Sequence, residues 1–173
     1  MPALARALDL IRVVPDFPAP GVLFRDLTPL FADGAALRVV AEELAARLPS
    51  DTEVLAAVEA RGFILAGALS MVTGLGLVPV RKPGKLPMVA DRVDYALEYG
   101  TATLELPADV VRAGQRVVVV DDVLATGGTA AAACQLLEGA GAEVAAVEVV
   151  VELTALSGRD ALPGREVHAL AAF

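Results

Sequence analysis

Residues 117–129 read VVVVDDVLATGGT, and this stretch decides the fold. Four consecutive valines are typical of a strand that is buried on both faces of a parallel sheet. Two acidic residues follow the valines, and the paired glycines after them permit a sharp turn into a helix. In parallel α/β sheets, ligands bind beyond the carboxyl ends of the strands. The stretch therefore predicts a central strand with a binding site directly after it.

Segments on both sides of this stretch alternate between helical and strand-like patterns of apolar residues. Helical patterns occupy residues 34–48, 63–74 and 125–142, and strand-like runs occupy 54–60, 75–82, 115–122 and 143–153. A short helix and an edge strand are expected in the tail. The alternation predicts an α/β fold, with one domain over residues 1–173 and a mostly parallel sheet flanked by helices.

Three further segments do not fit this simple alternation. After a helix expected at residues 2–12, the segment 13–29 contains several prolines, which should prevent regular structure. Residues 83–94 mix proline, glycine and charge without a period, so we expect an exposed and mobile excursion. Residues 95–106 alternate and contain good strand formers, which indicates a short hairpin or strand.

Composition excludes several classes of protein. With 173 residues, 56% of them hydrophobic, the chain can bury one good core. Its formal net charge of −8, without runs of Lys or Arg, argues against a nucleic-acid partner. No apolar run of about 18 residues could span a membrane, and no signal-peptide pattern opens the chain, so we expect a cytoplasmic protein. Cys134 is the only cysteine, which rules out an intrachain disulfide.

The turn after the central strand has the chemistry of a phosphate-binding cup. Gly127 and Gly128 let backbone N–H groups approach an anion, and the helix that begins there adds its positive end. Thr126 and Thr129 contribute hydroxyl donors, and Ala125 begins the same turn. We predict that these five residues hold one phosphate group.

Asp121 and Asp122 stand beside this cup. Two carboxylates would repel a bare phosphate, but they suit ribose hydroxyls or a metal ion next to one. The combination indicates a phosphorylated sugar as ligand. A P-loop is excluded because no lysine follows Gly128, and the dinucleotide fingerprint is missing from the turn. The plain alternative is that the acids merely end a strand and the glycines form a tight turn, but the intact stretch favours a ligand site.

The same stretch resembles the signature with which type I phosphoribosyltransferases bind 5-phosphoribosyl 1-pyrophosphate (PRPP). Five more segments resemble the adenine phosphoribosyltransferase branch of that family, in its order. They are FPAPGVLFRDLTPL (17–30), EARGFILAG (59–67), VPVRKPGKLP (78–87), YALEYGTATLEL (95–106) and VELTAL (151–156). The resemblance implies a type I fold with an N-terminal base-binding hood at about 1–33 and a mobile lid at about 83–104.

The resemblance also implies the activity and the partners. A member of this branch is a glycosyltransferase of purine salvage that converts adenine and PRPP into AMP and pyrophosphate. Leu23 would read the purine edge through its backbone, Phe24 would contact one purine face, Leu153 would close the other, and Arg25 would support the loop. The family resemblance further implies a homodimer, and an apolar patch buried by a second copy suits a chain with a mean hydropathy of +0.63.

Pyrophosphate would meet cations from two segments. Ala60 and Arg61 lie in what resembles the family's pyrophosphate loop, in which a cis peptide bond before a residue other than proline turns N–H groups toward the anion. Arg81 and Lys85 are further cations placed to receive pyrophosphate. For Arg61 the alternative is an ordinary solvated charge at the start of a helix.

Glu98 resembles the acid/base residue of the family, and Tyr99 would add a hydroxyl near the reaction centre. A carboxylic acid that hydrogen-bonds a purine ring nitrogen can offset the charge that develops on the base. From the hairpin pattern alone, Glu98 would instead face water. Mg²⁺ is implied by the pyrophosphate substrate and would bind through Asp121, Asp122 and substrate oxygens.

Two other functions share the predicted PRPP site. One is a phosphoribosyltransferase for a 6-oxopurine or for orotate, against which the segment FPAPGVLFRD argues. The other is a regulator that senses PRPP and binds DNA, for which the chain offers neither a spare domain nor a basic face. His168 lies away from every motif, so we interpret it as structural.

Overall fold

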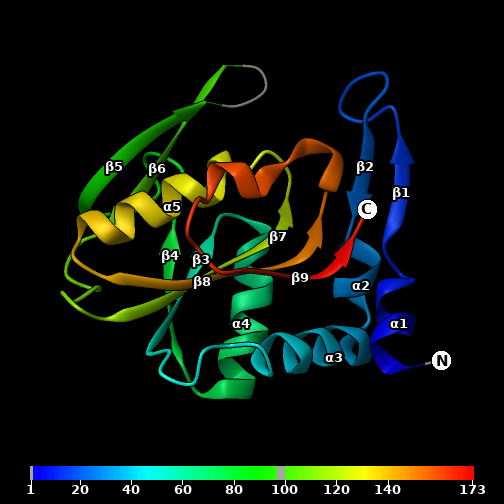
Figure 1. Ribbon diagram of the computed structural model, residues 1–173, viewed down its shortest axis with the longest axis horizontal. Coiled ribbons are helices and arrows are strands. Elements are labelled where there is room, and N and C mark those ends of the chain that lie inside the picture. The colour runs from blue at the N-terminus through cyan, green and yellow to red at the C-terminus, as the bar shows by residue number, and fades with distance from the viewer. Residues whose placement is uncertain (1, 97–99) are drawn as a thin grey trace.

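The computed structural model describes residues 2–96 and 100–173, and a five-stranded parallel sheet forms its centre (Figure 1). In spatial order the strands are β4 (Gly76–Val80), β3 (Val54–Val58), β7 (Arg116–Leu124), β8 (Glu143–Glu152) and β9 (Val167–Ala172). Every residue of β3 is buried, and so are the four consecutive valines 117–120 of β7. The predicted α/β class with a mostly parallel sheet is confirmed.

Helices cover both faces of the sheet, and the alternation of strand side chains divides the core between them. Leu55 and Ala57 pack in one cluster with α3 (Gly34–Ala45) and α4 (Arg61–Thr73). Ala56 and Val58 pack in the other, with α5 (Gly128–Gly139). Cys134 lies fully buried on α5 among these apolar side chains. The sheet is therefore covered on both faces.

Local sequence fixes where these helices begin and end. The Asp33 carboxylate accepts hydrogen bonds from Ala35 N and Ala36 N, both at 2.9 Å, and so caps the first turn of α3. Gly74 ends α4 in the left-handed conformation, with φ of 77°. Between them, α3 and α4 carry the chain back to the amino end of the sheet after the hood and after β3.

The N-terminal segment is more regular than its prolines suggested. α1 (Ala3–Leu8) is followed by an antiparallel hairpin of β1 (Arg12–Pro15) and β2 (Leu23–Asp26), and then by α2 (Thr28–Ala32). The expectation of irregular structure over 13–29 was therefore wrong. Pro15 ends β1 and the next two prolines lie in the loop, where no ladder N–H is required of them.

The segment before residue 95 also contains a strand that the sequence pattern did not show. β5 (Val89–Ala96) pairs antiparallel with β6 (Thr101–Pro107), which confirms the hairpin but corrects its start. A register shift between Val89 and Asp91 interrupts the alternation, and only Val93 and Tyr95 supply the inner side of the strand. Two inward residues are too few to show the alternation of a strand in the sequence.

The tail follows the prediction of a short helix and an edge strand. Its helix is two short 3₁₀ turns, η1 (Thr154–Leu156) and η2 (Gly158–Ala161), before β9 forms the edge of the sheet. Over residues 2–96 and 100–173, the helices are all too short or too polar to traverse a lipid bilayer.

Candidate active site

A cavity of about 450 Å³ lies at the carboxyl ends of β3 and β7. Its lining comes from the hood strand β2, the residues around the start of α4, Lys82 after β4, and the β5–β6 hairpin. The end of β7, the turn after it and the segment that follows β8 complete the lining. A smaller cavity of about 60 Å³ adjoins it at the turn after β7 and shares several lining residues with it. This is the position that ligands occupy in parallel α/β sheets.

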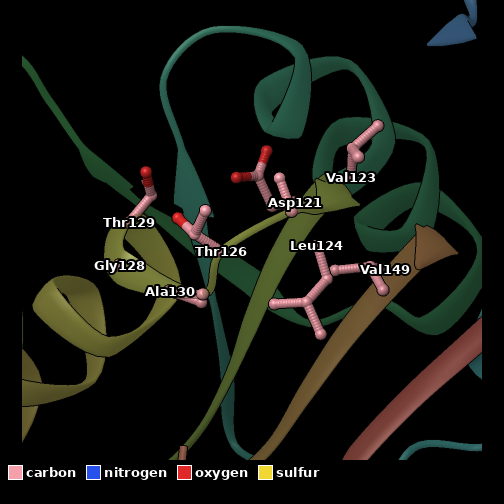
Figure 2. A pocket seen from close by; sticks show the side chains of 10 residues that line it. Asp121, Val123, Leu124, Thr126, Gly128, Thr129, Ala130 and Val149 are labelled. Atoms are coloured by element: carbon pink, nitrogen blue, oxygen red, sulfur yellow. The ribbon is translucent and has the colours of Figure 1, made fainter. Parts of the chain in front are cut away.

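The smaller cavity is the predicted phosphate cup, lined by residues 123–130 together with Asp121 and Val149. Figure 2 shows the side chains of Asp121, Thr126 and Thr129 on the same side of the turn. The helix α5 begins at this turn, so its first N–H groups and its positive end lie beside the cup. The structure thus brings the cup residues together.

Gly127 has a structural reason to be glycine. Its φ is 81°, and a Cβ there would overlap the carbonyl oxygen of Gly158 on η2. A Cβ on Gly158 would in turn overlap the carbonyl oxygen of Ala125. The backbones of the turn and of η2 therefore lie in close contact, which requires glycine at both 127 and 158.

The two acids continue β7 instead of ending it, and both line the larger cavity. Asp122 is only 3% exposed, and its Oδ2 lies 2.6 Å from Arg61 Nε. Burial raises the pKa of Asp121 well above its usual value, and the neighbouring Asp122 raises it further. Burial also raises the pKa of Asp122, although the Arg61 charge opposes that change. The cavity floor is thus acidic and poorly solvated.

Arg61 opens α4 and lies between the acidic pair and the hood. The peptide bond between Glu59 and Ala60 is cis, as the resemblance implied. The Arg61 side chain is 40% exposed, and its Cζ lies 5.2 Å from the centroid of the Phe24 ring. Ala60 and Arg61 both line the larger cavity. Arg61 is therefore more than a solvated charge at a helix start.

Apolar side chains reach the same cavity from two segments. Leu23 and Phe24 come from β2, where Arg25 also lines the cavity, and Leu153 and Leu156 come from the segment after β8. A largely apolar cavity with a few polar groups is the usual form of a small-molecule binding site. The structure thus brings all four predicted adenine-binding residues to one cavity.

The predicted cations Arg81 and Lys85 do not line this cavity. Arg81 Nε lies 3.3 Å from Glu59 Oε2, and its Nη1 donates to the Lys85 carbonyl oxygen. Lys82, which the sequence analysis did not select, lines the cavity instead, and its backbone N donates to Glu59 Oε2 at 2.8 Å. Neighbours in extended backbone point to opposite sides, so a pattern with three nearby cations could not identify the inward one.

Glu98 and Tyr99 lie outside the described residues. Within the described part of the same hairpin, Tyr95 and Ala102 line the larger cavity. The Thr129 hydroxyl donates to Tyr95 Oη at 3.3 Å, so β5 reaches the phosphate cup. The sequence analysis did not select Tyr95. Its place in the strand-like segment 95–106 was the only feature of the sequence that could have drawn attention to it.

The acids fit one mode of magnesium binding. Among the residues that the structure describes, no group of three or more His, Cys, Asp or Glu side chains could hold a metal ion alone. Mg²⁺ commonly uses one or two carboxylates together with waters and substrate phosphates. Asp122 Oδ2 is buried and forms an ion pair with Arg61 but no well-aligned hydrogen bond in the described structure, and Asp121 lines the cup. The pair therefore suits a shared site, not an all-protein cage.

Comparison with known proteins decides the family. Residues 31–162 match the model of the phosphoribosyl transferase domain. Over 167 residues the chain is 60% identical to the adenine phosphoribosyltransferase of Saccharopolyspora erythraea, covering 96% of this chain and 91% of that one. It is 54% identical to the Methylococcus capsulatus protein of the same name, covering 92% and 94%. The chain belongs to the adenine phosphoribosyltransferase family.

Solved structures of adenine phosphoribosyltransferases have the same fold. The protein from Thermoanaerobacter pseudethanolicus has a TM-score of 0.94 at 45% identity, covering 98% of this chain and 99% of that one. The protein from Giardia lamblia, complexed with 9-deazaadenine, has a TM-score of 0.93 at 34% identity, covering 100% and 99%. The predicted fold and enzyme class are confirmed, and the adenine phosphoribosyltransferase family is favoured over the oxopurine, orotate and regulatory alternatives.

Proposed function

We propose that this chain transfers the phosphoribosyl group of PRPP to adenine, producing AMP and pyrophosphate in purine salvage. One observation carries the proposal: a phosphate cup, an acidic pair and an apolar slot open into adjoining cavities at the end of one sheet. A phosphorylated ribose attached to a flat base needs these three environments in this order. The names of the closely similar relatives support the same reaction.

The ribose 5-phosphate would occupy the cup formed by residues 125–129. Backbone N–H groups at the start of α5 and the hydroxyls of Thr126 and Thr129 would donate to its oxygens. Asp121 and Asp122 would accept from the ribose hydroxyls. When Mg²⁺ is bound through these carboxylates and substrate oxygens, it would offset charge on the pyrophosphate.

Pyrophosphate would lie against Arg61 and Lys82. Both side chains line the larger cavity, and cations held there would stabilise the negative charge that grows as the bond to the ribose breaks. Arg81 and Lys85 would support this group from outside, because Arg81 contacts Glu59, the residue before Ala60. The role of Arg61 would be double, since it also neutralises Asp122.

Adenine would lie between Phe24 and Leu153, with its edge read by the Leu23 backbone and the hood supported by Arg25. Displacement at the anomeric carbon gives that carbon oxocarbenium character, so water must be excluded from the site. We propose that residues 83–104 act as the lid. Glu98 would exchange a proton with the purine, and Tyr99 would add a hydroxyl nearby.

We also propose that two copies form a homodimer through α4. Ile64, Ala68, Met71 and Val72 follow the spacing of one helical face, and Met71 is 86% exposed. A helix that is apolar on all sides is normally buried on all sides. A second copy of the chain would cover this face. A cytoplasmic location accords with a single buried cysteine that cannot form an intrachain disulfide.

A base panel tests the proposed reaction. Purified protein is incubated with PRPP and Mg²⁺, and the consumption of adenine, hypoxanthine, guanine and orotate is measured side by side. We expect PRPP-dependent consumption of adenine at a rate at least about a hundredfold above the other bases, because a site built for one hydrogen-bonding edge rejects the others. Equal consumption of hypoxanthine or orotate would contradict the adenine assignment and leave a PRPP-dependent transferase of other base specificity.

A further inference from the structure

Phe173 contacts the hood wall of the larger cavity. The Cζ atom of Arg25 lies 4.1 Å from the centroid of the Phe173 ring, which is the geometry of a cation–π contact. Arg25 itself lines the cavity, and its buried Nε has no hydrogen-bond acceptor among the described residues. Figure 1 shows the end of the chain beside β2. The ring is therefore a main support of this guanidinium.

The backbone of Phe173 is hydrogen-bonded to the segment that carries Leu153, which forms a second wall of the cavity. Its carbonyl oxygen accepts hydrogen bonds from both N and Oγ1 of Thr154, each at 2.8 Å. Its N–H donates to the Glu152 carbonyl oxygen at 2.9 Å. Glu152 and Thr154 are the two residues that flank Leu153, which lines the cavity. Phe173 thus holds the chain on both sides of Leu153.

We infer that Phe173 is a positioning residue for the base slot, because it joins the wall that carries Phe24 and Arg25 to the wall that carries Leu153. It touches neither substrate in the proposed arrangement, and it acts by fixing the separation of the two walls. A slot held at a fixed width needs less ordering when a flat base enters it. The inference rests on the proposed assignment of this slot to adenine.

Substitutions of Phe173 separate this role from general stability. Phe173→Leu keeps apolar bulk and the backbone bonds but removes the aromatic face. We expect it to raise the KM for adenine about two- to fivefold, the range of a partly exposed cation–π contact. The KM for PRPP and the kcat should stay at wild-type values, and the melting temperature should fall by about 2–4 °C at most. Phe173→Tyr keeps the ring face and should restore the wild-type KM for adenine.

A double-mutant cycle tests whether Phe173 acts through Arg25. Arg25→Gln should raise the KM for adenine by itself, and adding Phe173→Leu should raise it no further, since the contact is already lost. Phe31→Leu is the matched control, because Phe31 lies on α2 outside the cavity. It removes an aromatic ring and can lower the melting temperature, but it should leave the KM for adenine unchanged.

Each outcome decides the inference. An unchanged KM for adenine in Phe173→Leu, equal losses for adenine and PRPP, or full additivity with Arg25→Gln would overturn it. Absence of adenine turnover by the wild-type protein would instead overturn the proposed function, so the two failures are distinguishable. A selective and non-additive rise in the KM for adenine, rescued by tyrosine, establishes the positioning role.

Discussion

At the scale of single residues, Arg61 connects the parts of the site. Its guanidinium lies against buried Asp122 and faces the Phe24 ring. Its removal would leave Asp122 without its ion-pair partner and, in the proposed site, would take a cation away from pyrophosphate. Because the Arg61 side chain is 40% exposed, solvent screens part of the ion pair, so its contribution to stability is smaller than that of a fully buried pair.

Arg61→Ala and the double mutant Arg61→Ala/Asp122→Asn should separate the effect on stability from the effect on PRPP binding. We expect Arg61→Ala to lower the free energy of unfolding by about 1–2 kcal/mol, because an unpaired acid remains buried. It should also weaken PRPP binding by about tenfold or more. Adding Asp122→Asn should restore stability without restoring PRPP binding. Denaturant melts and PRPP titrations measure the two effects, and restored PRPP binding in the double mutant would contradict this assignment.

His168 links stability to pH. Its Nδ1 lies 2.5 Å from Oε1 of Glu148, which is fully buried, and its Nε2 lies 3.0 Å from Glu166. Burial lowers the pKa of His168, but the two carboxylates raise it more, so the net pKa is above the usual value. A raised histidine pKa contributes stability below the unfolded value of 6.5, and this contribution is lost as pH rises through the folded value.

We therefore expect the free energy of unfolding to fall as the pH rises from about 6 to about 8. Burial also raises the pKa of Glu148, which acts in the same direction. The pKa values of Asp26 and Glu152 are lowered, so these acids act only at lower pH. Urea melts across this range, for wild type and His168→Gln, check the prediction. An identical slope in both proteins would show that other groups carry the pH dependence.

At the scale of elements, the close contact between the cup and η2 makes the fold sensitive to any side chain at position 127. Gly127→Ala should lower the free energy of unfolding by about 2 kcal/mol or more, because a left-handed φ and a backbone overlap act together. Gly164 is the matched control, since its φ is 74° but a Cβ there meets nothing within 4 Å. Gly164→Ala should cost only the conformational strain, about 1 kcal/mol. Thermal melts compare the two, and equal losses would mean that η2 does not press on the cup.

The same elements show what the sequence could and could not predict. The buried strands β3, β7 and β8 and the turn at 125–129 were predictable, because a parallel sheet requires apolar runs and the turn requires glycine. The hood hairpin and the start of β5 could not be predicted. The hood strands are short and partly exposed, and a register shift interrupts β5, so neither shows a clear alternation of apolar and polar residues. Choosing Lys82 over Arg81 required the orientation of the backbone, which sequence alone does not contain.

At the scale of the whole molecule, the apolar face of α4 predicts a dimer. Met71→Lys should produce monomers, because a charge would be buried at the centre of the proposed interface. Met88→Lys is the control, since Met88 is 62% exposed and lies just before β5, outside α4. Light scattering after size-exclusion chromatography gives the mass of each variant. Wild-type protein that elutes as a monomer at micromolar concentration would refute the interface.

The buried thiol of Cys134 makes the protein suitable for site-directed labelling. Burial raises the pKa of this thiol to about 11, so almost no thiolate exists near neutral pH and reagents cannot reach the sulfur. A cysteine introduced on an exposed position, such as Arg92→Cys on β5, would then be the only reactive one. A fluorophore or spin label attached there would report the position of the hairpin during turnover, without removal of the native cysteine.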